Sequence, residues 1–261
     1  MLGLFVSLCL MLGTWAILRG GFAGDLRGWR MTGFDSNALG LGAVAIIAAI
    51  WYFGWVYGIT LILAVMLHEF GHVAAFRVCG HTDARFRLIP LLGGVAISSR
   101  IPASHDRQVF ISLMGPAICL APMCLSFALA DLMYSAQPFV AAWLNIFATV
   151  LATLNFLNLL PLWPFDGGRI VQVLIYAISP KASRTVSIIM SGLALVAAIK
   201  LQSFLLMFVV ATSVRGLFMS EQLTAMQRPM TGRTAITAGL AYAATTGAFL
   251  TGAQRLLGML L

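Results

Sequence analysis

Two histidines and a glutamate lie close together in the pentad His68-Glu69-Phe70-Gly71-His72. An α-helix turns once in about 3.6 residues, so residues i and i+4 lie one above the other on the same face. Two imidazoles placed in this way can hold one metal ion, normally zinc, and the adjacent glutamate can hold or deprotonate a water molecule. The pentad therefore predicts a metal site with its own general base.

The pentad interrupts a hydrophobic run, between Ile59–Met66 and Val73–Phe76. A glutamate at membrane depth is costly, and ionisable residues inside membrane spans are by default functional. The alternative is two core histidines that bond to neighbouring polar groups. The sequence favours the metal site, and places its water-dependent chemistry below the membrane surface.

A catalytic zinc ion usually has three protein ligands and one open position for water, so a third ligand is needed. His81 and His105 fall near predicted membrane interfaces and are poor candidates. Asp166 is better placed, because prolines and glycines break the helical pattern around it. Broken backbone at membrane depth is tolerated only where protein buries it or water reaches it. The alternative is that Asp166 only starts the helix expected at Gly168–Ile178.

The elements that must position these residues are membrane helices. Of the 261 residues, 61% are hydrophobic and 9% are charged, and the mean hydropathy is +0.96. A soluble domain carries about a quarter charged residues. We expect an all-α polytopic membrane protein with about eight transmembrane helices. The expected spans are approximately residues 1–18, 38–54, 57–78, 108–130, 139–160, 184–200, 203–220 and 234–252.

The net charge is +8, and most of the basic residues lie in the gaps between the apolar runs. Of the 16 basic residues, 14 lie in or beside the gaps that follow the first, third, fifth and seventh expected spans. The positive-inside rule then places these gaps in the cytosol and both termini outside. The third and fifth spans both run from outside to inside, so the pentad and Asp166 can meet at similar depth on the cytosolic side. Basic charge distributed in this way predicts no nucleic-acid partner.

Residues 80–107 do not read as a span. Arg85–Ile89 alternates in polarity, residues 95–99 have moderate β character, and Pro90 and the pair Gly93-Gly94 punctuate the middle. We expect a short β-hairpin on the cytosolic side, or a strand that dips into the membrane, after the helix that carries the pentad. The alternative is an irregular loop.

Three motifs together resemble the site-2 protease family of intramembrane zinc metalloproteases. They are His68-Glu69-x-x-His72, Gly115-Pro116 and Asn158-x-x-Pro161-x-x-Pro164-x-Asp166-Gly167. The resemblance covers roughly residues 57–178 and implies a three-helix metalloprotease core there. The apolar runs outside this core predict N-terminal transmembrane helices in 1–56 and C-terminal transmembrane helices in 179–261. Two positions depart from the family: Cys119 stands where many relatives have Asn, and Phe165 where Leu is usual.

The resemblance implies His68, His72 and Asp166 as the metal ligands for one Zn²⁺ per chain, with Glu69 as the catalytic base. It also implies that Asn158 helps to bind or orient the substrate. The strand around Gly93 and Gly94 would engage the unwound substrate.

The expected function is that of a zinc endopeptidase that cuts peptide bonds in or near the transmembrane segments of other proteins. Its partners would be a transmembrane substrate protein and the lipid bilayer, and its location a bacterial-type cell (inner) membrane. One alternative is a metal-binding scaffold or chaperone that grips helices without cutting them, although such a protein has no need of Glu69. A zinc or proton transporter is the third possibility, but the other spans are poor in carboxylates and histidines.

Overall fold

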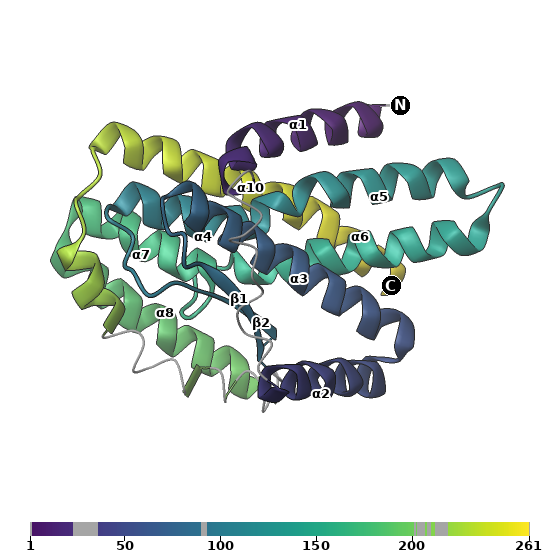
Figure 1. Ribbon diagram of the computed structural model, residues 1–261, viewed down its shortest axis with the longest axis horizontal. Helices are drawn as coiled ribbons and strands as arrows, with labels where there is room; N and C mark the ends of the chain where they lie inside the picture. The colour runs from purple at the N-terminus through teal and green to yellow at the C-terminus, as the bar shows by residue number, and fades with distance from the viewer. Residues whose placement is uncertain are drawn as a thin grey trace. The chain divides into compact units, whose positions relative to one another are not determined.

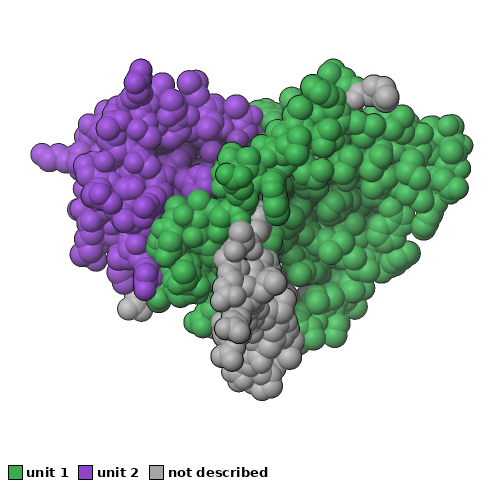
Figure 2. All heavy atoms as spheres, turned by 45° about the horizontal axis from the view of Figure 1, so that its top comes forward, with its two compact units in different colours: residues 1–99, 114–156, 247–261 green, residues 100–113, 157–246 purple. Residues whose placement is uncertain are grey.

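The structure is a computed structural model that describes residues 2–22, 36–89, 93–200, 202, 207, 210–211 and 219–260 (Figure 1). It is mostly helical. The chain divides into two compact units, coloured separately in Figure 2. Unit 1 comprises residues 1–99, 114–156 and 247–261, and unit 2 comprises residues 100–113 and 157–246.

Unit 1 is built around the helix α3, which packs against other helices of the unit and against a small sheet. Both α1 and α2 pack on α3, and α1 also packs on α5. Fully buried alanines lie on α3, α5 and α6. Because their side chains are small, the helices can pack closely together. The helices of this unit are α1 (Leu2–Phe22), α2 (Ser36–Phe53), α3 (Trp55–Val78), α5 (Leu120–Met133), most of α6 (Pro138–Asn158) and the end of α4 (His105–Ile118).

Glycines set both ends of α3. Gly54 separates α2 from α3 with a positive φ of 80°, a conformation that glycine adopts without strain. At the other end, Gly80 has a φ of 91°, the Gly80 N–H donates to the Arg77 carbonyl and the His81 N–H donates to the Phe76 carbonyl. This pair of bonds is a Schellman motif, which stops the helix and turns the chain toward the sheet.

The sheet consists of β1 (Arg85–Ile89) and β2 (Gly93–Ile97), which pair antiparallel from Arg85↔Ile97 to Ile89↔Gly93. The pair lies within residues 80–107, the stretch for which the sequence predicts a short hairpin or a strand that dips into the membrane. Both strands contact α3, and β1 also contacts α2. Residues 90–92 lie outside the described residues.

The open end of the sheet is held by the Asp83 carboxylate. It accepts hydrogen bonds of 2.6 Å from both the backbone N–H and the hydroxyl of Ser99, and a longer one from the Ser98 hydroxyl. The Ser98 hydroxyl also lies 2.8 Å from His81 Nδ1. The bonds from Ser99 lower the pKa of Asp83 to about 2, so the carboxylate stays charged at neutral pH.

Unit 2 contains α7 (Asp166–Ile178), α8 (Pro180–Lys200), the first part of α4 and the first part of α10 (Gly232–Leu260). The α7 helix packs on α8, and the Ser183 hydroxyl donates to the Gln172 carbonyl at 3.0 Å. At the start of α4, the His105 N–H donates to the Arg228 carbonyl, and His105 Nε2 lies 3.0 Å from the Thr224 carbonyl oxygen. These bonds fix the α4 N-terminus to residues 224–228 of the same unit.

Five helical stretches among the described residues are long and apolar enough to cross a membrane. They are Leu2–Gly21, Trp55–Val78, His105–Met133, Pro138–Asn158 and Pro180–Lys200. These are the lengths and compositions of a membrane protein, as the sequence predicts. The other expected spans differ: α2 has only the shorter apolar stretch Gly42–Phe53, α10 is not among the five, and the span 203–220 falls mostly outside the described residues. The count of eight stays a prediction.

Candidate metal centre

The α3 helix places the two histidines of the pentad as their spacing predicts. His68 and His72 are 4% and 7% exposed, and their Nε2 atoms lie 3.1 Å apart. Two nitrogens bound at about 2.0–2.1 Å to one tetrahedral ion are about 3.3–3.4 Å apart. The two imidazoles are therefore spaced to share one ion. Glu69, next to His68 on the same helix, is also buried.

The backbone around His72 is packed tightly enough to require glycine at two positions. A Cβ atom on Gly115 would collide with the His72 imidazole, and a Cβ atom on Gly71 would collide with the Met114 carbonyl oxygen. The α3 backbone and the Gly115-Pro116 element of α4 thus approach each other directly. Small residues at such a crossing let two backbones come close, and here they leave the imidazole ring little room to rotate.

Sequence reasoning missed Asn155, a residue of α6 that is fully buried. Its Oδ1 lies 2.8 Å from His68 Nδ1, and its Nδ2 donates to the Leu151 carbonyl at 2.8 Å. A signal was present in the sequence, because an amide inside an apolar span needs partners within the protein. Only the fold identifies His68, 87 positions away, as the partner.

In unit 2, Asp166 is the first residue of α7 and is 7% exposed. The segment before it is folded by short backbone bonds, including those from Leu162 N–H to the Leu160 carbonyl and from Phe165 N–H to the Leu162 carbonyl. A Cβ atom on Gly167 would collide with the Leu159 carbonyl oxygen. Asp166 thus starts a helix, as the alternative for this residue predicts, and its buried carboxylate sits where the chain is tightly folded.

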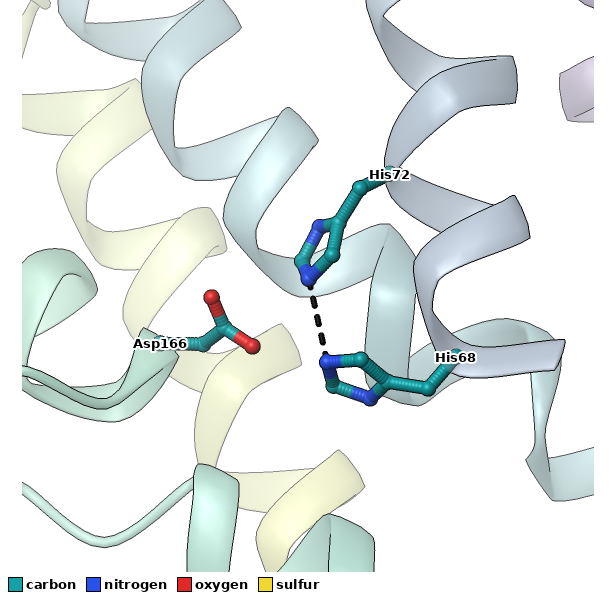
Figure 3. A group of neighbouring side chains, drawn as sticks. All are labelled: His68, His72 and Asp166. Carbon is teal, nitrogen blue, oxygen red and sulfur yellow. Dashed lines mark hydrogen bonds between the residues drawn. The ribbon is translucent and has the colours of Figure 1, made fainter. Parts of the chain in front are cut away.

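The ligand atoms of His68, His72 and Asp166 all lie within 4.8 Å of one another, and Figure 3 draws the three side chains. No other group of three His, Cys, Asp or Glu side chains in the described part of the chain has this spacing. Two imidazoles and one carboxylate are a set that holds catalytic zinc in other proteins and leaves a position for water. The group could therefore bind a metal ion.

The remaining residues singled out by the sequence belong to α6, the sheet and the two ends of the loop between α3 and α4. Asn158 is the last residue of α6 and is partly buried. Gly93 and Gly94 belong to β2, opposite Ile89 and Leu88 of β1. Neither His81, near Ser98, nor His105, near Thr224, is in the group that could bind a metal.

Residues 128–199 match the model of peptidase family M50, the site-2 proteases. A zinc metalloprotease of Methanocaldococcus jannaschii is 29% identical over 123 residues, which are 45% of this chain and 33% of that protein. The resemblance to the site-2 protease family is confirmed. The stage IV sporulation protein FB of Bacillus subtilis is 28% identical over 114 residues, 44% of this chain and 38% of that protein. The chain thus matches only 33–38% of the length of these relatives.

Among solved structures, the site-2 protease from M. jannaschii aligns with a TM-score of 0.45 and 22% identity, over 75% of this chain and 91% of that chain.

Zinc is the metal that the site-2 protease family implies. The ligand types and the spacing of the two imidazoles fit that ion.

Proposed function

We propose that this chain is an intramembrane zinc endopeptidase that hydrolyses peptide bonds in or near the transmembrane segments of substrate proteins. The observation that carries the proposal is the pairing of His68 and His72 Nε2 atoms at 3.1 Å on a helix apolar enough to cross a membrane, with Glu69 buried beside them. A scaffold that only holds metal has no use for a buried carboxylate at that position.

In this proposal His68, His72 and Asp166 hold one zinc ion. Zinc bound there would polarise the scissile carbonyl and favour deprotonation of a water molecule near neutral pH. Glu69 takes the proton as the water oxygen bonds to the carbonyl carbon, and gives it to the amine nitrogen when the C–N bond breaks. The reaction consumes one water and leaves Glu69 in its starting state.

A transmembrane substrate is helical, so its peptide bonds must be unwound before they can be cut. We assign substrate binding to the strand around Gly93 and Gly94, which would pair with an extended segment through backbone hydrogen bonds, and to Asn158. The β2 strand supports this role, because it pairs with β1 on one edge and contacts α3, the helix of the pentad.

The proposal includes the wider organisation of the protein. The protease core comprises residues 57–178, with accessory membrane helices in 1–56 and 179–261 and about eight spans in all. The basic gaps lie in the cytosol, both termini lie outside, and the site faces the cytosolic side of a bacterial-type inner membrane.

The decisive experiment compares the wild-type protein with Glu69→Gln in proteoliposomes. A panel of tagged proteins, each with one transmembrane span, serves as the candidate substrates. We expect wild type to release fragments cut within apolar segments, and Glu69→Gln to be slower by about 10²–10⁴-fold, the usual contribution of a general base. Both should retain one zinc per chain. Glu221→Gln is the matched control, because Glu221 lies in unit 2 beside Arg184 on the partly exposed surface.

Two outcomes would overturn the proposal. Full activity in Glu69→Gln would show that Glu69 is not the general base. A wild-type protein that binds zinc and a substrate segment but releases no fragment from any member of the panel would instead support the scaffold.

A further inference from the structure

The side chain of Asn155 is fixed at both ends inside unit 1. It is fully buried on α6, its Nδ2 lies 2.8 Å from the Leu151 carbonyl oxygen, and its Oδ1 lies 2.8 Å from His68 Nδ1. Both distances are those of well-formed hydrogen bonds.

The chemistry of these partners determines which way round the amide lies. A carbonyl oxygen can only accept a hydrogen bond, so the group that faces Leu151 must be the NH₂ of Asn155. The amide oxygen therefore faces His68. Since an amide oxygen can only accept, His68 Nδ1 must carry the proton and donate it.

This orientation settles the tautomer of His68. A neutral imidazole carries one proton, so a proton on Nδ1 leaves the lone pair on Nε2. The lone pair is thus on the nitrogen that lies 3.1 Å from His72 Nε2, inside the group that could bind a metal. If the proton were on Nε2, that nitrogen could not act as a ligand.

We propose that Asn155 is a positioning residue for the metal, which holds His68 in the tautomer and ring orientation that present Nε2 as a ligand. The inference rests on the proposed zinc site and adds to it a residue outside the three motifs. Partners of this kind fix the ring of a ligating histidine and raise its basicity, and their loss typically weakens metal binding by about 10–100-fold.

The test measures zinc affinity by competition with a chromophoric chelator, using the full-length protein in detergent at one pH. Asn155→Leu keeps the size of the side chain but removes the acceptor, and we expect its zinc Kd to rise by about 10–100-fold. Asn155→Asp keeps an acceptor at the same position, and we expect its Kd to return to within a few-fold of wild type. A merely structural role for the amide would not produce this recovery.

Thr149→Val is the matched control, because Thr149 is a buried polar residue of the same helix whose hydroxyl has no hydrogen-bond partner among the described residues. Its zinc Kd should equal that of wild type. The thermal unfolding of each zinc-free variant shows whether a lost affinity reflects a lost fold.

The outcomes separate this inference from the function on which it rests. A wild-type protein that binds no zinc overturns the proposed site. Wild-type zinc binding with an unchanged Kd in Asn155→Leu overturns the positioning role alone, and so does an Asn155→Asp variant that is folded but binds as weakly as Asn155→Leu.

Discussion

At the scale of single residues, Gly115 constrains the position of the His72 ring because it has no side chain. The His72 imidazole occupies the space where a Cβ atom of residue 115 would lie. Any larger residue there must displace either the ring or the helix backbone. The ring position therefore depends on a residue that contributes no functional group.

We predict that Gly115→Ala displaces His72, destabilises the protein by about 1–3 kcal/mol through overpacking, and weakens zinc binding. Thermal unfolding and zinc content measure the two effects. Gly13→Ala on α1 is the control, because nothing lies within 4 Å of a Cβ atom at that position; it should leave both quantities unchanged or raise stability slightly. Wild-type zinc content in Gly115→Ala would contradict the close packing around His72.

At the scale of elements, the exposed Asp83 carboxylate joins the segment between α3 and β1 to the residues that follow β2. Asp83 receives hydrogen bonds from Ser98 and from the backbone and hydroxyl of Ser99, at the open end of the strand pair. In the folded protein the pKa of Asp83 is about 2, below the 3.8 of a free aspartate side chain. Stability from this group is therefore complete above the higher value and is lost as the pH falls through the lower one.

We predict that Asp83→Ala speeds amide hydrogen exchange at Ser99 and along β2 several-fold at neutral pH, because the acceptor of the Ser99 N–H is lost. Thr82→Ala, an exposed neighbour, is the control and should leave exchange unchanged. The wild-type contribution of Asp83 should be constant between about pH 5 and about pH 8. Equal protection of Ser99 in both variants would show that the carboxylate does not hold the strand.

The elements also show the limits of prediction from the sequence. The start of α7 and the end of α3 could be placed, because prolines and glycines act on the local backbone. The contacts that order the site could not, because they join residues distant in sequence, such as Asn155 and His68. An apolar span has hydrophobic residues on every face, so its pattern does not tell which side faces a neighbouring helix.

At the scale of the whole molecule, the proposed orientation rests on the distribution of arginine and lysine. With 14 of the 16 basic residues in or beside alternate gaps, the positive-inside rule gives one orientation. The loop after α3 would lie in the cytosol, and the loop between α5 and α6 would lie outside. The two loops differ in charge, since the first carries several arginines and residues 131–138 carry no Lys or Arg.

We predict that a cysteine introduced at Ser135 reacts with an impermeant maleimide in intact cells, whereas one at Thr82 reacts only after the membrane is permeabilised. Both positions are exposed in the structure. A background without the four native cysteines removes their labelling. The reverse pattern would mean that the centre faces the outer side, and the positive-inside interpretation would be wrong.

The sequence by itself determined that two imidazoles and a carboxylate share one stretch of a membrane helix, because the i, i+4 spacing acts within a single turn. It also determined a resemblance to the site-2 protease family, because the three motifs are local patterns. Only the tertiary structure decided that Asn155 lies against His68 and Gly115 against His72. Those contacts depend on the rotation and depth of packed helices. Neither can be inferred from the sequence of a helix that is apolar on every face.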